Sequence, residues 1–151
     1  VSGQTRKRLF WTNIPNIEQP IDRNIEFSSI LEDLPFRELK PFCFINGGYG
    51  MSGMKSICDK KSNTLTTSNT HNKMYLLNAD KTLFRTMSPI EFERLQSLDD
   101  NYTKYGVSGK INNTNRYKCL GNAFNVEVVK HILSYMDYGK EKMNEPRPES
   151  N

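Results

Sequence analysis

The sequence has no apolar stretch that approaches the ~18 residues of a membrane-spanning helix, and its first residues lack the pattern of a secretory signal. Cysteines are few, since Cys43, Cys58 and Cys119 are scattered, odd in number and form no CxxC pair. This scarcity argues against a disulfide framework and favours a reducing compartment, so we expect a cytoplasmic protein. The two histidines, His71 and His131, lie far from the cysteines and from each other, so no metal site is expected.

Neither sign of charge dominates the chain. It has 21 lysines and arginines against 17 aspartates and glutamates, which gives a net charge of +4. The mixture of signs argues against wholesale disorder, and 151 residues suit one ordinary domain. The mild basic excess permits a polyanionic partner without requiring one. Because the first residue is valine rather than methionine, we expect a truncated chain, a processed product or a piece of something larger.

Several short runs of β-forming residues are separated by turn residues. Residues 8–14 have the composition of a buried strand that ends before a proline. Residues 74–77 and 82–85 are expected to form a hairpin, with its turn at 78–80. Further strands are expected at 42–45, 55–58 and 63–67.

One helix is indicated by its start signals. Ser88 is a candidate N-cap, Pro89 stands at the first helical position and Glu91 at the third, which together make a capping box. Met87 and Phe92 stand at the positions of a hydrophobic staple. The helix is expected to end before residue 99, and a shorter helix is expected to start at Ser28.

A second long helix is expected at about 125–138, with Gly139 just beyond its end. Its apolar stripe has helical spacing and consists of Val128, Val129, Ile132, Leu133 and Met136. A small irregular domain would struggle to cover so wide a stripe. Residues 103–118 are expected to form a polar loop, and residues 139–151 a disordered tail.

Four motifs along the chain are distinctive in combination. They are the basic segment Gln4-Thr-Arg-Lys-Arg8, the glycine-rich block from Ile45 to Thr67, the helix start from Arg85 to Gln96, and the Leu120-Gly-Asn-Ala-Phe124 sequence. In this order they resemble the C-terminal part of DNA (cytosine-5) methyltransferases, over about residues 2–136. The resemblance implies an enzyme that transfers a methyl group from S-adenosylmethionine to C5 of a cytosine turned out of the duplex.

The first motif looks like the QxRxR segment of that family. Spacing of two along an extended chain puts Gln4, Arg6 and Arg8 on one face, and guanidinium groups suit phosphates and base edges. By resemblance, Arg8 would contact the flipped cytosine and the DNA backbone, Arg6 would hold phosphate or sugar, and Gln4 would bind DNA. The alternative from the residues alone is a solvated basic strand end.

The glycine-rich block resembles a target-recognition loop followed by a strand. Four glycines fall within residues 46–53, which suits either a flexible hairpin tip or a backbone pressed against a ligand. By resemblance, Tyr49 would fill the space left by the extruded base. The DNA-binding residues implied in this block are Gly48, Tyr49, Met51, Lys55, Thr64 and Thr66.

The last two motifs have structural and cofactor roles in the family. The helix from Pro89 would brace the recognition region, with Glu91 and Arg94 close enough on one face to pair. The residues implied to line the S-adenosylmethionine pocket are Gly121, Asn122, Ala123 and Phe124. The alternative is a glycine turn before a core helix.

The family's attacking cysteine lies in a Pro-Cys dipeptide, and none of the three cysteines here follows a proline. The sequence therefore suggests an α+β chain: a small, mixed, β-rich target-recognition domain plus the last strand and return helix of a Rossmann-like methyltransferase domain. The expected divisions are 1–20 for the end of the catalytic domain, 21–120 for recognition, 121–138 for the return helix and 139–151 for the tail.

Two functions follow from this interpretation. In the first, the chain supplies recognition and part of the cofactor pocket, binds double-stranded DNA, and is inactive without an N-terminal catalytic half. In the second, it is a non-catalytic, sequence-specific DNA-binding module. A cytoplasmic, bacterial or phage-encoded protein fits both.

Overall fold

The structure of the protein is a computed structural model, and it describes residues 1–38, 55–65 and 74–136. The elements in chain order are η1 (Phe27–Ile30), β1 (Arg37–Glu38), β2 (Lys55–Ser56), β3 (Tyr75–Leu77), β4 (Leu83–Thr86), α1 (Pro89–Leu95), β5 (Tyr105–Gly106), β6 (Gly109–Lys110), α2 (Asn113–Asn122) and α3 (Val126–Leu133). The predictions for the strand at 42–45, the glycine-rich segment 46–53, Gly139 and the tail lie outside the described residues.

The larger sheet has the strand order β1-β4-β3-β2, with β2 parallel to β3 and the other pairs antiparallel. The predicted β3–β4 hairpin is confirmed, with Leu77 opposite Phe84. Its turn is held by the Asn78 side-chain oxygen, which accepts the N–H groups of Thr82 and Leu83, each at 2.9 Å. An asparagine that bonds the backbone beyond it is a favoured turn residue, so this element was readable from local sequence.

Helix α1 starts as its sequence predicts. The Ser88 hydroxyl accepts the Glu91 N–H at 3.2 Å, and the Glu91 carboxylate accepts the Ser88 N–H at 2.8 Å. The predicted capping box is therefore confirmed, with Pro89 at the first helical position. The start predicted at Ser28 is a short 3-10 helix, η1, which begins one residue earlier.

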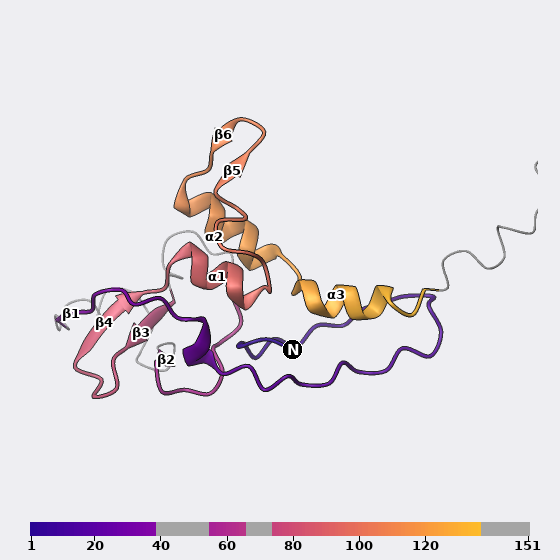
Figure 1. Cartoon of the computed structure of the whole chain (residues 1–151), viewed down its shortest axis with the longest axis horizontal. Coiled ribbons are helices and arrows are strands. Elements are labelled where there is room, and N and C mark those ends of the chain that lie inside the picture. The colour runs from indigo at the N-terminus through magenta and orange to yellow at the C-terminus, as the bar shows by residue number, and fades with distance from the viewer. Residues whose placement is uncertain (39–54, 66–73, 137–151) are drawn as a thin grey trace, which may run out of the picture.

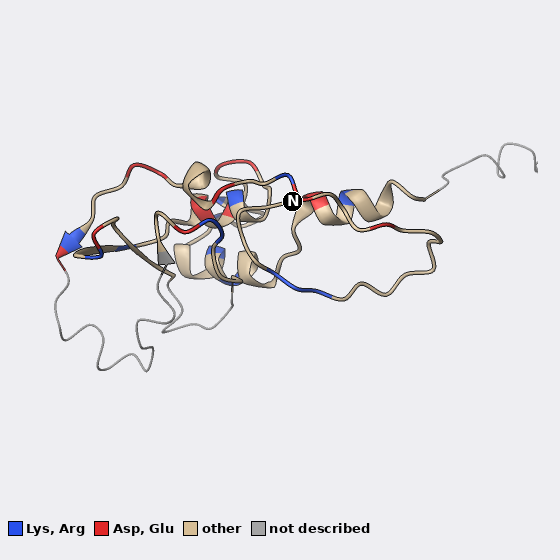
Figure 2. Ribbon diagram, turned by 90° about the horizontal axis from the view of Figure 1, so that it is seen from below, with Lys and Arg blue, Asp and Glu red and all other residues tan. Residues whose placement is uncertain are grey.

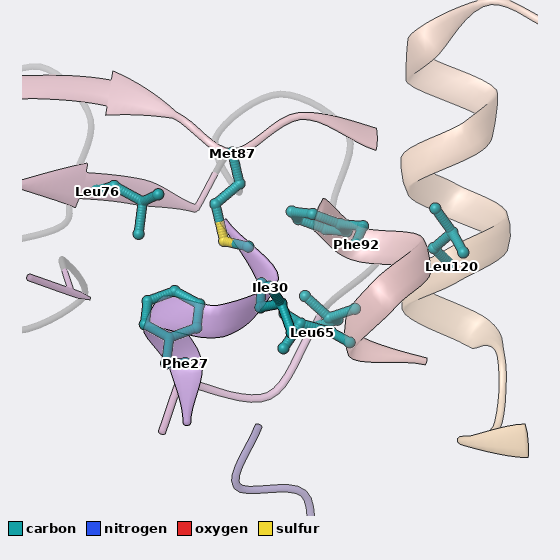
Figure 3. Packing of buried hydrophobic residues seen from close by; sticks show 8 residues of the cluster. Phe27, Ile30, Leu65, Leu76, Met87, Phe92 and Leu120 are labelled. Carbon is teal, nitrogen blue, oxygen red and sulfur yellow. The ribbon is translucent and has the colours of Figure 1, made fainter. Parts of the chain in front are cut away.

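The hydrophobic core lies where the sheet, η1, α1 and α2 meet (Figure 3). Its buried members are Phe27, Ile30, Leu65, Leu76, Met87, Phe92, Leu95 and Leu120. Met87 and Phe92, the two residues of the expected staple, are both in this cluster. Tyr117 of α2 closes one side, because its ring lies edge-on to Phe92 with centroids 4.8 Å apart.

The polar loop predicted at 103–118 is wrong. The chain there forms a two-stranded hairpin, β5–β6, and then α2, which starts where the Asn112 side chain accepts the Asn115 N–H at 2.9 Å. Few apolar residues mark this helix, so periodicity could not reveal it. It is held instead by Leu120 in the core and by an ion pair from Arg116 to Glu93.

The strands predicted at the front of the chain and at 63–67 are also corrected. Residues 8–14 are not a strand, and Leu9 and Trp11 are 86% and 93% exposed. Among the described residues, the only β-bridge before β1 joins Gln4 to Ser62. β-forming side chains favour a strand only where a neighbouring strand and a covered face exist, and the described part of the chain offers residues 8–14 neither. Residues 63–65 likewise form no strand, and β2 covers only the first two residues of the strand predicted at 55–58.

Residues 1–26, here called the arm, run out along α3 and return to η1 (Figures 1 and 2). The returning leg is tied to α3 by Arg23 to Glu127 at 2.7 Å and by the His131 ring nitrogen beside the Glu18 carbonyl at 2.8 Å. Helix α3 confirms the start of the second predicted helix, and it has no buried residue. Of the predicted apolar stripe, Leu133 is 50% exposed, whereas Val128, Val129, Ile132 and Met136 are partly buried.

Candidate functional site

Gln4, near the start of the arm, is buried against the end of α1. Its amide nitrogen donates to the Leu95 carbonyl at 3.0 Å and to the Gln96 side-chain oxygen at 3.2 Å. Gln96 in turn donates to the Leu120 carbonyl at 2.7 Å. The structure thus places Gln4, expected to bind DNA, inside the protein at 7% exposure, where its contacts fix the path of the arm.

Arg6 also turns inward. Its guanidinium donates to three backbone carbonyls, those of Leu65, Gly121 and Ala123, each at 3.0 Å. Burial lowers the pKa of Arg6, and the neighbouring positive charge of Arg8 lowers it further. The carbonyl contacts use both terminal nitrogens of Arg6, and its Nε is buried, so the side chain is turned away from an external phosphate or sugar.

Lys7 and Arg8 are exposed, and neither has an ion pair or hydrogen bond within residues 1–38, 55–65 and 74–136. Together with Arg6 they form a basic stretch on the outgoing leg of the arm (Figure 2). Unpaired cations at fixed positions attract anions, and guanidinium groups pair well with phosphates.

A cleft of about 730 Å³ opens beside this basic stretch, between the arm and α3. Phe10 and Phe124 form part of its wall, with ring centroids 6.0 Å apart. Its lining includes three cations and a single carboxylate residue, Glu18, so the cleft favours an anionic ligand. Its volume falls in the range typical of small-ligand sites.

The Gly-Asn-Ala motif directly precedes Phe124 and Asn125, which line this cleft, but it is built differently from the predicted turn. Gly121 and Asn122 form the last turn of α2, and Ala123 caps it by donating to the Cys119 carbonyl at 2.9 Å. Phe124 is 60% exposed and faces the cleft. Phe124 and Asn125 have backbone N–H groups that bond to no described residue, and of the two residues Phe124 is exposed whereas Asn125 is buried.

Of the residues predicted to contact DNA in the glycine-rich block, two are described. The Thr64 hydroxyl donates to the Thr5 carbonyl at 2.6 Å, and Lys55 is placed by its backbone in β2. Thr64 is exposed and sits next to the arm, so the structure brings these two segments together. Gly48, Tyr49, Met51 and Thr66 lie outside the described residues.

The pairing expected between Glu91 and Arg94 is wrong. Glu91 is fully buried and binds Arg85 through both carboxylate oxygens, at 2.6 and 2.9 Å. Arg94 instead pairs with Asp100 at 2.6 Å and donates to the Ile30 carbonyl at 3.1 Å. Three-residue spacing places two side chains near each other on a helix. The Glu91 carboxylate nevertheless pairs with Arg85 of β4, because both groups are buried and the guanidinium binds both carboxylate oxygens.

Glu93, on the other side of α1, is also fully buried and accepts Arg116 at 2.8 Å. Burial raises the pKa of this carboxyl, but hydrogen bonds from Thr103, Arg116 and Asn101 outweigh burial and lower it overall. The helix therefore holds β4 of the larger sheet through Glu91 and α2 through Glu93.

No separate role was predicted from the sequence for three side chains near the cleft, those of Lys7, Gln96 and Asn125. Gln96 and Asn125 fix the Gly-Asn-Ala segment: Asn125 donates to the Leu95 carbonyl at 3.1 Å and caps α3 by accepting the Val128 N–H. Lys7 is an unpaired cation between the two arginines. The Asn-x-x-Val spacing before an apolar stripe is a cap signal that could have identified Asn125, whereas the burial of Gln96 depends on segments distant in sequence.

Within the part of the chain that the structure describes, no helix is long and apolar enough to cross a membrane. In the same residues no group of three or more histidine, cysteine, aspartate or glutamate side chains could hold a metal ion.

Residues 3–137 match the family model described as C-5 cytosine-specific DNA methylase. Over 84 residues the chain is 37% identical to the Type II methyltransferase M.Sau3AI of Staphylococcus aureus, a match covering 55% of this chain and 19% of that protein. The solved structure of the Entamoeba histolytica methyltransferase EhMeth shares the fold, with a TM-score of 0.60 and 16% identity over 82% of this chain and 44% of that one. The chain spans less than half the length of either relative.

Proposed function

The chain belongs to the C-5 cytosine-specific DNA methylase family, and from this premise we propose that it is the C-terminal part of such an enzyme. It binds double-stranded DNA, reads the target and forms part of the S-adenosylmethionine pocket. The segment that carries the nucleophile comes from an N-terminal catalytic half, either of the same protein or of a separate subunit. On its own the chain is inactive.

The observation that carries this proposal is the pair of unpaired cations, Lys7 and Arg8, beside a cleft that Phe124, directly after the Gly-Asn-Ala segment, lines. Arg8 contacts the backbone and edge of the extruded cytosine, and Lys7 adds phosphate attraction that weakens with salt. Arg6 is not available for this role in the described arrangement, because three backbone carbonyls hold its guanidinium.

Target reading is assigned to the glycine-rich block. Tyr49 fills the gap left by the extruded base, where stacking is worth roughly 1–3 kcal/mol. Lys55 and Thr64 hold a base edge and the backbone, and each good base contact discriminates by about 1–3 kcal/mol. The bond from Thr64 to the Thr5 carbonyl supports this assignment, because it ties the block to the arm. Gly48, Met51 and Thr66 complete the proposed DNA-binding set.

The residues beside the cleft fit S-adenosylmethionine. The exposed ring of Phe124 provides an aromatic surface, and the backbone N–H group of the same residue, which bonds to no described residue, provides a donor for a carboxylate or a base edge. The position of Phe124 is fixed by the residues before it. Arg6 donates to the carbonyls of Gly121 and Ala123, and Asn122 is the last residue of α2. When bound, S-adenosylmethionine supplies the methyl group.

The uncovered apolar surface supports docking to a catalytic half. Leu9 and Trp11 on the arm are almost fully exposed, and Leu133 on α3 is 50% exposed. Large exposed apolar patches mark interaction sites. The expected cytoplasmic, bacterial or phage setting remains part of this proposal.

The first test measures duplex binding by fluorescence anisotropy across a salt series. Arg8→Met should reduce the slope of log K against log salt by about 0.9, the contribution of one phosphate contact. Lys110→Met, which removes an exposed cation from β6 on the far hairpin, should leave the slope unchanged. Equal effects of the two variants would refute the assignment of Arg8.

The second test mixes the chain with the N-terminal catalytic half and follows transfer of labelled methyl groups to DNA. Activity only in the mixture supports the split arrangement. The competing function is a non-catalytic, sequence-specific DNA-binding module, which the unpaired cations Lys7 and Arg8 support equally well. It would be shown by salt-dependent DNA binding with no activity in any mixture.

A further inference from the structure

Arg6 connects three parts of the molecule that are far apart in sequence. One terminal nitrogen donates to the Leu65 carbonyl next to the recognition block, and the other donates to the carbonyls of Gly121 and Ala123. All three distances are 3.0 Å. A planar guanidinium can bridge several carbonyls in this way, whereas a lysine ammonium presents only a point charge.

The neighbouring contacts make this bridge part of a larger junction. Gln4 binds the Leu95 carbonyl and the Gln96 side chain, and Gln96 binds the Leu120 carbonyl. The carbonyls of Leu120, Gly121 and Ala123 are thus held by Gln96 and Arg6. The arm is anchored through Thr5 as well, since its N–H donates to the Ser62 carbonyl at 2.9 Å.

The next polar ties between the arm and the rest of the chain lie on the returning leg and include those of Glu18 and Arg23. Lys7 and Arg8, which directly follow Arg6, have no hydrogen bond within the described part of the chain. An anion bound at Arg8 therefore restrains the arm two residues from the bridge. It also offsets the repulsion between the two guanidinium charges, which are close enough to interact.

We propose that Arg6 is a positioning residue that couples DNA binding on the arm to the geometry of the Gly-Asn-Ala segment. Anion binding at Arg8 favours the bridged state of Arg6, and the bridged state holds the carbonyls of Gly121 and Ala123 in place. By linkage, a ligand that needs this geometry tightens DNA binding by the same factor. The coupling step rests on the proposed DNA role of Arg8, whereas the bridge itself does not.

The test follows amide hydrogen exchange in the full 151-residue chain. The N–H groups of Ala123 and Val126, which bond the carbonyls of Cys119 and Gln96, report on the segment. Arg6→Met should speed their exchange by about tenfold, because the lost charge-assisted bonds no longer oppose local opening. Lys110→Met, the matched control, removes an exposed cation from β6 and should leave their exchange unchanged.

A duplex of about 20 base pairs at low salt then tests the coupling. It should slow exchange at Ala123 and Val126 in the unmodified chain, but not in Arg6→Met. Arg6→Lys should restore the effect only in part, since an ammonium cannot span all three carbonyls.

Each outcome decides one part of the proposal. The local role of the Arg6 bridge would be refuted if exchange in Arg6→Met were unchanged, or if it were equally faster throughout the α1 core. If Arg6→Met does not fold, Arg6→Lys tests the same point. Duplex protection that persists in Arg6→Met would overturn the coupling. If the duplex does not protect the unmodified chain, the coupling fails together with the DNA role of Arg8, while the local effect of Arg6→Met still confirms the bridge.

Discussion

Neutralising Glu91 should be among the most destabilising single changes in the chain. Glu91→Gln keeps a side-chain oxygen for the capping box but removes the charge that Arg85 faces. The carboxylate is fully buried and accepts Arg85 twice, together with the backbone N–H groups of Glu32 and Ser88. Arg85 is 6% exposed, so the substitution leaves a buried charge without its counter-ion.

Removing one partner of such a pair typically costs about 3–5 kcal/mol. Folded domains are stable by only about 5–15 kcal/mol, so the expected loss is a large part of the total. Arg85→Met should cost a similar amount because it strands the buried Glu91 carboxylate. The double variant should cost clearly less than the sum of the two, since it leaves no buried charge at either position.

The assay is urea unfolding followed by far-ultraviolet circular dichroism. Tryptophan fluorescence would not serve, because the only tryptophan is 93% exposed on the arm. Asp100→Asn is the matched control on an exposed ion pair of α1: Asp100 binds Arg94 at 2.6 Å, and the two side chains are 46% and 32% exposed. Its expected cost is about 0.2–1 kcal/mol. Additive losses in the double variant, or a loss for Glu91→Gln no larger than that of the control, would refute the reasoning.

Three further predictions address other parts of the molecule. The lowered pKa of Glu93 means that this carboxylate stabilises the fold above the pKa of an unfolded glutamate and loses that effect as pH falls through the folded value; urea midpoints below about pH 5 should therefore depend less on pH in Glu93→Gln. Trp11 should show the emission of a solvated indole, and addition of the catalytic half should shift it to the blue; an unchanged spectrum in an active mixture would contradict docking through the arm. Asn125→Ala should lower stability by about 1–2 kcal/mol, and Asn125→Asp should not restore it fully, because a carboxylate keeps the capping oxygen but cannot donate to the Leu95 carbonyl.

Local sequence was sufficient where a structure depends on residues close together in the chain. The start of α1 follows from Ser88, Pro89 and Glu91, which satisfy one another within a single turn. The β3–β4 hairpin follows from Asn78, whose side chain bonds the backbone four and five residues on. Neither element needs a distant partner to be recognised.

Where the deciding contact is distant, sequence reasoning failed in a consistent way. Helix α2 depends on Arg116 reaching Glu93, 23 residues away, so its polar composition suggested a loop. The inward turn of Arg6 depends on carbonyls of residues 65, 121 and 123, whereas a sequence alone shows only that the arginine is charged. Residues 8–14 have strand-forming side chains, yet the described chain places no strand beside them.

Helix α1 has only seven residues, yet two of its acidic side chains are buried against different arginines. Replacing a single member of either pair, Glu91–Arg85 or Glu93–Arg116, leaves the other member as a buried charge without a counter-ion. Across an alignment of relatives, positions 85 and 91 should therefore vary as a pair, and positions 93 and 116 as a second, independent pair. Paired variation of this kind would indicate that the packing around α1 is kept while the rest of the sequence diverges.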